Sequence, residues 1–460
     1  MLKSNVYICF LIFQIANVSQ AQIVFENTYG SSYFEEAKAV KQTPDGGYII
    51  GGTMLVKVDA SGNEEWTKPY ISTYANTTDD QGYILINSNS PTIIFTKVDQ
   101  NGDVLWQTNY SQGIWANHGR YIEQADDGGY IVAGNYQDVA GSGMLLLKLD
   151  SLGNKLWQRT FSEATSAAFC HGFSAQQTND NGYIIAGYTY IDYYTESIHK
   201  DVFVVKTDSL GNEQWRKYFG GEMDDIGSYV KQDALGNFFI AATTSSYGVG
   251  TESNMYLVKL DSNGDSLWSK TYGGEFEDTA TGLWSTDDGG CILVGQSNSF
   301  TSTSGGHNAY VVKTNSAGDS LWTINYGGSG IEGLNSVQQT FDDGYIMAGF
   351  TNSIGAGDFD MLLLKTDSLG NLDFNTGVIE AHSSSHNYKV HPNPVSERLV
   401  VKSDEKISSP LIIRNIHGEI VARYPTEMRR LDVSFLKNGV YFLHLVINNT
   451  PITEKFIIMN

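Results

Sequence analysis

Short apolar segments of about five to eight residues alternate with polar turns along most of the chain. In seven places an apolar segment carries a lysine, an Asp or Asn follows two residues later, and an aromatic residue follows seven residues after that. The lysines are Lys57, Lys97, Lys148, Lys206, Lys259, Lys313 and Lys365. The polar and aromatic residues that follow are Asp59 and Trp66, Asp99 and Trp106, Asp150 and Trp157, Asp208 and Trp215, Asp261 and Trp268, Asn315 and Trp322, and Asp367 and Phe374. This pattern predicts a β-hairpin seven times over.

A second turn and strand precede each hairpin. The turn contains Asp-Gly or Asn-Gly before Tyr48, Tyr130, Tyr183 and Tyr345, and these residue pairs tolerate the positive φ of tight hairpin turns. The unit therefore has four strands and repeats at about 50 residues, which is the pattern of a propeller blade. We predict an all-β fold with a seven-bladed β-propeller, in which neighbouring sheets cover each other's apolar faces.

The N-terminal segment repeats the last strand of a unit without the three strands that should precede it. Phe25 and Tyr29 have the four-residue spacing of the two aromatic residues that end six of the units. We expect residues 22–30 to supply the outer strand of the last blade, to pair with strands from residues 333–367, and so to close the ring.

The second unit departs from the repeat. Only 13 residues separate Tyr70 from Tyr83, whereas four other units have 19 residues at this place. A thin or irregular second blade is predicted.

Residues 387–460 alternate strands with turns but lack the repeat, and the alternation predicts a small immunoglobulin-like β-sandwich. Four features occur there in order: Pro392-Asn393-Pro394, Gly418, a hairpin with Gly439 and Tyr441, and Lys455 in the final strand. In these features the segment closely resembles the C-terminal sorting domain of the type IX secretion system of Bacteroidetes. The resemblance implies recognition by the type IX secretion machinery, followed by release or by attachment to the outer-membrane surface.

The first residues have the composition of an export signal. Lys3 precedes the apolar stretch 6–15, and Ser19 and Ala21 are small residues suited to cleavage after Ala21. We expect a signal peptide at 1–21, the propeller at 22–374, a linker at 375–386 and the sorting domain at 387–460. No later run reaches the ~18 apolar residues of a membrane-spanning helix, so a soluble, secreted monomer is expected.

Composition and charge narrow the range of ligands. The net charge is −22, and Lys and Arg are too few to neutralise a phosphate backbone, so nucleic acid is not expected as a partner. Cys170 and Cys291 occupy different positions of non-adjacent units, so we interpret them as buried thiols rather than a disulfide.

Side chains that break the repeat are the better candidates for function. Thirteen residues before the Tyr48 position, where a strand is expected to line the central channel, stand Glu35, Asp225, Asp278 and Glu332. These four are candidate channel-mouth carboxylates. Ca²⁺ prefers oxygen ligands, but a channel of seven blades is expected to be too wide for all four to bind one ion. Backbone capping is the alternative, and no metal or cofactor is predicted.

One position further along, two adjacent units carry histidines at equivalent places, and a later loop is rich in tyrosine. The candidate ligand-binding residues are Trp115, His118, Arg120, His171, Tyr190, Tyr193 and Tyr194. Two histidines suit a transition metal, but no third ligand is evident, and hydrogen-bonded histidines are the alternative. Tyrosine rings suit sugars or protein partners, and packing alone is the other interpretation.

Enzymatic motifs are missing from the sequence. It has no Gly-x-Ser-x-Gly, no His-Glu-x-x-His and no phosphate-binding loop. The predicted propeller contains only Arg120, Arg159 and Arg216, too few for the arginine cluster of a sialidase. We expect a non-catalytic binding module for glycan or protein. The alternative is an extracellular polysaccharide-processing hydrolase that uses the propeller carboxylates.

Overall fold

The computed structural model describes residues 23–111, 116–138, 141–162, 169–191, 199–250, 252–301, 306–372, 388–392, 395–403, 406–407, 411–415, 420–437, 439–447 and 450–459. The signal peptide predicted at 1–21 and the linker predicted at 375–386 lie outside these residues. One compact unit comprises Ile23–Asp373, and a second contains the residues from Phe374 onward. The two units are described separately below.

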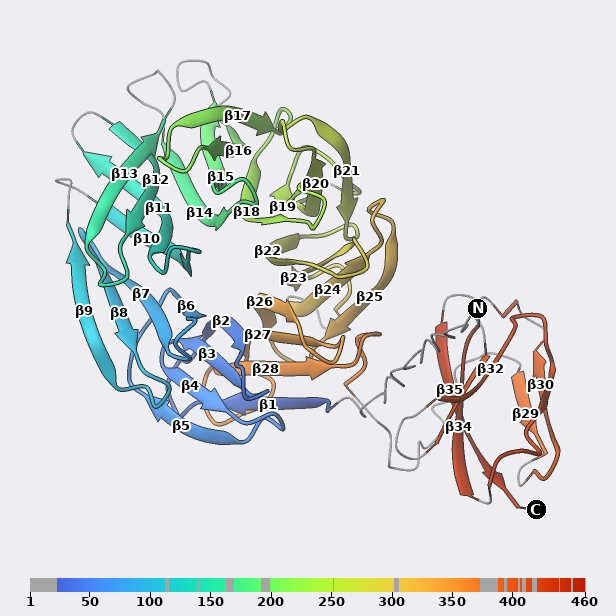
Figure 1. The fold of residues 1–460 in the computed structure, drawn as a ribbon. Helices are drawn as coiled ribbons and strands as arrows, with labels where there is room; N and C mark the ends of the chain where they lie inside the picture. Colours follow the sequence, from blue (N-terminus) through green and yellow to red (C-terminus); the bar gives the residue numbers. More distant parts are fainter. Residues whose placement is uncertain are drawn as a thin grey trace, which may run out of the picture. The chain divides into compact units, whose positions relative to one another are not determined.

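The first unit consists of seven four-stranded antiparallel sheets arranged in a ring (Figure 1). Blade 1 is β2 (Ala37–Gln42), β3 (Tyr48–Gly52), β4 (Leu55–Val58) and β5 (Glu64–Lys68), and blade 2 is β6 (Tyr74–Thr77), β7 (Tyr83–Asn89), β8 (Thr92–Val98) and β9 (Val104–Tyr110). Blade 3 is β10 (Ala116–Gln124), β11 (Tyr130–Asp138), β12 (Gly141–Leu149) and β13 (Lys155–Phe161), and blade 4 is β14 (Cys170–Gln177), β15 (Tyr183–Ile191), β16 (His199–Thr207) and β17 (Glu213–Phe219). The seven-bladed propeller is therefore confirmed.

The remaining blades follow the same order, with the inner strand first. Blade 5 is β18 (Asp225–Gln232), β19 (Phe238–Thr244), β20 (Asn254–Leu260) and β21 (Ser266–Tyr272). Blade 6 is β22 (Asp278–Ser285), β23 (Cys291–Ser297), β24 (Asn308–Thr314) and β25 (Ser320–Tyr326). Blade 7 is β26 (Glu332–Gln339), β27 (Tyr345–Thr351), β28 (Asp360–Thr366) and the N-terminal β1 (Phe25–Tyr29).

The N-terminal strand closes the ring as expected. β1 pairs antiparallel with β28 and places Phe25 opposite Lys365, the register that places Trp66 opposite Lys57 in blade 1. Phe25 therefore takes the place that the repeat pattern gave to Phe374, which lies outside the described residues. The prediction for the second blade also holds, because β6 has only four residues.

Aromatic residues fill the layers between blades. At six of the seven junctions between blades, an aromatic ring of the outer strand contacts an aromatic ring on the second strand of the next blade. The ring centroids of these pairs are 5.7–6.1 Å apart. The pairs are Phe25–Tyr48, Trp66–Tyr83, Trp106–Tyr130, Trp157–Tyr183, Trp215–Phe238 and Trp322–Tyr345. Phe25 of blade 7 thus packs on blade 1 in the same way as the tryptophans. Cys170 and Cys291 are buried thiols, as interpreted from the sequence, and each lies within hydrogen-bonding distance of a threonine hydroxyl.

The recurring lysines are buried ion-pair partners. All seven are 1–6% exposed, and each contacts an aspartate of the preceding turn at 2.7–3.1 Å. The aspartates are Asp45, Asp80, Asp127, Asp180, Asp233, Asp288 and Asp342. In six of the seven the ammonium group also donates to a backbone carbonyl at the end of its own strand, for example from Lys206 to Thr207 at 2.9 Å. Each pair therefore links two strands of one blade.

These aspartates predict how the fold responds to acid. Burial alone would raise their pKa, but hydrogen bonds from the lysine and from nearby backbone N–H groups outweigh it, so the pKa is lowered in Asp45, Asp80, Asp127, Asp180, Asp233 and Asp288. The unfolded chain then binds these protons at higher pH than the folded chain. The stabilisation is fully present above about pH 4 and is lost as the pH falls through the lowered pKa values.

We expect the melting temperature to fall cooperatively below about pH 4, measured by circular dichroism between about pH 2 and pH 7. A melting temperature that stays constant over this range would contradict the role assigned to the ion pairs.

The second unit is a two-sheet sandwich. One sheet contains β29 (Tyr388–His391), β30 (Arg398–Ser403) and β33 (Arg430–Asp432), and the other contains β32 (Ile420–Tyr424), β31 (Leu411–Asn415), β34 (Gly439–Ile447) and β35 (Thr450–Ile458). Leu399 and Val401 of the first sheet share one core with Ile413, Leu443 and Phe456 of the second. The described part of the chain contains no helix able to cross a membrane.

Candidate ligand-binding site

A β-bulge recurs in six of the seven inner strands. The extra residue has no partner on the second strand, and bulges of this kind re-aim a side chain. The bulged residues are Lys38, Arg120, Phe173, Ser228, Thr281 and Asn335. Arg120 of blade 3 and Phe173 of blade 4 contact each other, with the guanidinium carbon 5.3 Å from the ring centroid. The bulges thus place a cation on an aromatic face between two blades.

Further rings extend this contact onto β15. The ring of Tyr188 stacks on His171 with centroids 4.9 Å apart and 19° between the planes, and it lies 5.8 Å from Phe173. Tyr190 meets Tyr188 edge-on at 5.9 Å and contacts Phe169, which is 39% exposed, at 6.1 Å. The result is a continuous row of half-buried rings on two adjacent strands.

Lys200, in β16, supplies a second cation to the row. Its Nζ lies 5.9 Å from the ring centroid of Tyr188 and 5.6 Å from that of Tyr190. Asp224 holds it in place, because its carboxylate accepts hydrogen bonds from the Lys200 Nζ at 2.6 Å and from the Lys200 backbone N–H at 3.0 Å. We name the set His118, Arg120, His171, Phe173, Tyr188, Tyr190 and Lys200 the blade 3/4 cluster.

Burial and neighbouring cations favour the neutral form of the two histidines of this cluster. Burial, followed by the charges of Arg120, His118 and Lys200, lowers the pKa of His171 to about 4. Burial, followed by Arg120, lowers the pKa of His118 as well. The side-chain amide of Asn135 is hydrogen-bonded to His171 Nδ1, with Nδ2 and Nδ1 2.7 Å apart. The cluster therefore presents two fixed cations beside neutral rings.

The structure brings together four of the seven predicted ligand-binding residues. His118, Arg120, His171 and Tyr190 lie in the cluster, whereas Trp115, Tyr193 and Tyr194 lie outside the described residues. Phe173, Tyr188 and Lys200 were not among the predicted residues. The bulge that aims Phe173 and the pairing that brings Lys200 to Tyr190 have no local signature in the sequence. Among the described residues, no three His, Cys, Asp or Glu side chains are grouped as metal ligands.

The four predicted channel-mouth carboxylates start or immediately precede inner strands, but they do not open onto the channel. Glu35, Asp225, Asp278 and Glu332 are at most 6% exposed. They turn instead into the loops between blades, where Asp225 Oδ2, for example, accepts from the backbone N–H of Gly221 at 2.9 Å. A ring of carboxylates at the channel mouth is therefore wrong, because hydrogen-bond donors of the connecting loops draw these side chains away from the channel. This arrangement matches the backbone-capping alternative.

Other side chains of the inner strands meet across the centre of the ring. The hydroxyl groups of Tyr74 in blade 2 and Tyr229 in blade 5 are hydrogen-bonded at 2.7 Å, and Tyr121 packs against both rings. Lys231 of blade 5 forms an ion pair with Glu123 of blade 3 at 3.2 Å. These buried contacts tie opposite blades together.

Lys41 belongs to this central layer and lies 4.8 Å from the ring centroid of Trp284. Burial, followed by the charge of Lys231, lowers the pKa of Lys41 to about 7, while Glu123 acts in the opposite direction. The sequence did not single out these residues, because their contacts join inner strands far apart in the chain.

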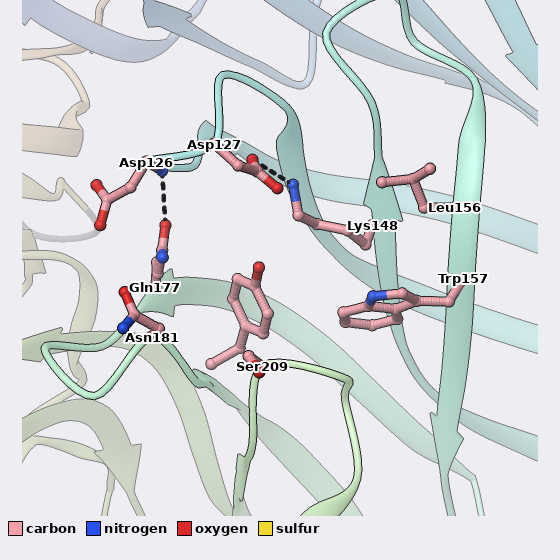
Figure 2. Close-up of a pocket in the computed structure, with 9 residues that line it drawn as sticks. Asp126, Asp127, Lys148, Leu156, Trp157, Gln177, Asn181 and Ser209 are labelled. Carbon is pink, nitrogen blue, oxygen red and sulfur yellow. Dashed lines mark hydrogen bonds and ion pairs between the residues drawn. The ribbon is translucent and has the colours of Figure 1, made fainter.

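A pocket of about 400 Å³ lies between blades 3 and 4 at the turns (Figure 2). Asp127 and Lys148 form an ion pair at 2.7 Å in its lining, which also contains Trp157. Both the ion pair and the tryptophan recur from blade to blade. The lining of this pocket therefore belongs to the repeat and does not distinguish it as a ligand site.

In the second unit, Tyr441 of the predicted sorting motif is 8% exposed, stacks on Phe456 at 5.9 Å and donates to the Lys437 carbonyl at 2.9 Å. Gly439 begins β34, and Lys455 pairs with Phe442 in the backbone ladder of β34 and β35. Pro392 follows β29 directly. Asn393, Pro394 and Gly418 lie outside the described residues.

Comparison with known families identifies the second unit. Residues 389–459 match the secretion system C-terminal sorting domain. This confirms the resemblance to a type IX sorting domain, and the protein is therefore secreted or attached to the cell surface by the type IX machinery. No curated protein sequence matches the chain.

Solved structures of several propellers are similar over most of the chain. The extracellular domain of a one component system from B. thetaiotaomicron is 11% identical with a TM-score of 0.42, over 94% of this chain and 59% of that one. PorZ, a surface component of the type IX secretion system of Porphyromonas gingivalis, is 8% identical with a TM-score of 0.35, over 90% and 69%. A PL25 ulvan lyase is 10% identical with a TM-score of 0.48, over 76% and 96%. Similarities of this size carry no information about the function of this chain, which spans 59% of the first of these proteins.

Proposed function

We propose that the exported chain is a non-catalytic binding module and that the blade 3/4 cluster binds an anionic glycan. The observation that carries the proposal is the contact of Arg120 with Phe173 at two adjacent bulges, continued by the stacked rings of His171, Tyr188 and Tyr190. Flat aromatic faces suit the apolar faces of sugar rings. A guanidinium group binds a carboxylate or sulfate through paired hydrogen bonds.

The charges around the cluster support an acidic ligand. Arg120 is exposed and forms no ion pair with a carboxylate of the described residues, whereas Lys200 already shares its charge with Asp224. In this proposal Arg120 binds the acidic group of the ligand. Lys200 positions the rings of Tyr188 and Tyr190. The chain as a whole has a net charge of −22, so this positive site is local.

The arrangement of carboxylates favours binding without turnover. Glycoside hydrolysis needs two carboxyl groups about 5–10 Å apart on either side of the bond to be cleaved. The four carboxylates considered for this role are buried against backbone, and Asp224, the carboxylate at the cluster, is paired with Lys200. A hydrolase is therefore the less favoured alternative.

Replacement of Arg120 by Ala or of Tyr190 by Ser is expected to weaken binding of oligogalacturonate at least about tenfold. The loss follows from removing the guanidinium that faces the sugar carboxylate or the ring that stacks on the sugar. Isothermal titration calorimetry with the exported chain measures the change.

Lys38→Ala is the matched control, because Lys38 occupies the same bulge in blade 1 and lies outside the cluster. Equal binding by wild type and both cluster variants, or an equal loss in Lys38→Ala, would contradict the site. Binding of neutral maltohexaose as tightly as oligogalacturonate would contradict the role of charge.

A product assay on the same oligosaccharide separates the two functions. We expect no new reducing or unsaturated ends after prolonged incubation with the exported chain. Turnover that is abolished by a carboxylate variant would establish the hydrolase instead. A protein ligand is the other alternative, and it would bind without competition from the oligosaccharide.

A further inference from the structure

Four junctions between blades repeat one arrangement of oxygen atoms. A residue at or near the start of a third strand faces the carboxylate at the start of the next blade, and a glycine lies between the two side chains. The trios are Asp201, Gly220 and Asp225; Asn254, Gly273 and Asp278; Asn308, Gly327 and Glu332; and Asp360, Gly30 and Glu35. A methyl group on any of these glycines would collide with one of the two side chains. The glycine therefore leaves the space in which the oxygens face each other.

The junction that closes the ring shows the arrangement most clearly. A methyl group on Gly30 would collide with Asp360 Oδ1 and lie 3.0 Å from Glu35 Oε2, so these two oxygens face the same point. Their other oxygens are occupied, because Asp360 Oδ2 accepts from the backbone N–H of Ala356 at 2.8 Å and Glu35 Oε1 accepts from Ser31 Oγ at 2.6 Å. Glu35 is 6% exposed, Asp360 is 2% exposed, and Glu35 Oε2 is buried without a hydrogen-bond partner.

The junction between blades 4 and 5 has the same pair of acids. A methyl group on Gly220 would collide with Asp201 Oδ1 and lie 2.8 Å from Asp225 Oδ2. Asp225 is fully buried, and its Oδ2 also accepts hydrogen bonds from the backbone N–H of Gly221 at 2.9 Å and from Ser246 Oγ at 2.6 Å. Its Oδ1 and Asp201 Oδ1 have no hydrogen-bond partner, and Asp201 Oδ1 lies 3.8 Å from His199 Nε2. Burial raises the pKa of Asp201, His199 opposes this effect, and the charge of Asp225 raises the pKa further.

The other two junctions replace one acid with an amide that offers only its oxygen. Asn254 Nδ2 donates to the Val249 carbonyl at 3.0 Å, and Asn308 Nδ2 donates to the Phe300 carbonyl at 3.4 Å. The amide oxygen therefore faces the carboxylate of Asp278 or Glu332. Four junctions thus hold opposed oxygens, and two of these junctions hold two acids.

Opposed, buried carboxylate oxygens repel each other unless a proton or a cation lies between them. Oxygen-only ligands of this kind suit hard cations rather than zinc or copper. Ca²⁺ accepts irregular sets of carboxylate, carbonyl and water oxygens, whereas Mg²⁺ demands a near-ideal octahedron. The irregular loop between Gly30 and Glu35 therefore favours Ca²⁺.

We propose that Ca²⁺ binds between Glu35 and Asp360 and between Asp201 and Asp225, and that each ion links two neighbouring blades. Each site has two carboxylates, and backbone carbonyls and water complete the ligand set. Sites with few charged ligands fall in the affinity class of extracellular modules, with Kd on the order of 10⁻⁴–10⁻³ M. Such affinity suits a protein exported from the cell.

The test is calorimetric and thermal titration of the exported chain with CaCl₂ after treatment with EGTA. We expect a stoichiometry near two and a rise in melting temperature of roughly 5 °C at about 10 mM CaCl₂. Glu35→Gln and Asp225→Asn are each expected to remove one site and about half of the thermal shift. Glu332→Gln is the matched control, because its partner is Asn308, and it should keep both sites.

A wild-type chain that gives no heat with CaCl₂ and melts identically in CaCl₂ and EGTA would overturn the proposal, and it would indicate that each pair shares a proton. A shift that survives in the Glu35→Gln/Asp225→Asn double variant would overturn it as well. The wild-type titration needs no variant, so a variant that fails to fold does not weaken the test.

Discussion

Removal of residues 23–30 is expected to lower the melting temperature of the exported chain by roughly 5 °C or more. This segment is the outer strand of blade 7, and all five residues of β1 pair with β28. It also contacts blade 1, because Tyr29 donates to the Gly62 carbonyl at 2.6 Å and Asn27 donates to the same oxygen at 2.8 Å. The strand therefore joins the last blade to the first.

The expected magnitude follows from these contacts. Burial of Tyr29 contributes about 2 kcal/mol, and each hydrogen bond contributes about 1 kcal/mol. The sum, on the order of 4 kcal/mol, is a large fraction of the stability of many domains. The deletion also leaves β28 as an open edge, which favours aggregation.

Thermal melts of the full exported chain and of a variant that begins at Ser31 measure the effect. A synthetic peptide of residues 23–30, added in excess, should recover part of the lost stability. β1 is held to the other three strands of blade 7 by non-covalent contacts, so a separate peptide can take its place. An unchanged melting temperature in the deletion variant would refute ring closure by this strand.

The second large effect is expected from the buried ion pairs. Asp180→Ala should destabilise the propeller by about 2–3 kcal/mol, because Lys206, which is 3% exposed, would keep its charge without a counter-ion. Asp180 itself is 55% exposed, so water reduces the loss below that of a fully buried pair. Urea-induced unfolding followed by tryptophan fluorescence measures this change.

Two further variants test the explanation. The Asp180→Ala/Lys206→Met double variant should recover most of the stability, because it leaves no charge to be buried. Asp265→Ala removes the partner of Lys217 at an ion pair that is 33% and 71% exposed, and stability should barely change. A double variant less stable than Asp180→Ala would show that the charge of Lys206 is not the source of the loss.

The repeat made the fold predictable from the sequence in unusual detail. The N-terminal strand with Phe25 and Tyr29 is not preceded by the other three strands of a blade. It therefore has to complete a sheet that lacks its fourth strand, and that sheet is blade 7. Phe374 fits the spacing of the aromatic residues equally well, so spacing alone could not show that Phe25 takes this place. The recurring lysines were visible, but their partner is an aspartate on a different turn, which sequence spacing does not reveal.

The candidate site was predictable only where it follows the repeat. His118 and His171 hold equivalent positions in adjacent blades, and equivalent positions become neighbours in a ring. The direction of a side chain is set by bulges and local donors, so the contact of Arg120 with Phe173 could not be predicted. Contacts across the ring, such as that between Tyr74 and Tyr229, join residues 155 positions apart and depend on the radius of the propeller.

We expect the acidic oligosaccharide to bind at the blade 3/4 cluster. Hydrogen–deuterium exchange of the exported chain, with and without saturating oligogalacturonate, tests it most directly. We predict slower exchange in β10, β14 and β15, and no change in the equivalent strands β18 and β19 of blade 5. Slower exchange confined to the turns around Asp127 and Asn181, or no change anywhere, would contradict the claim.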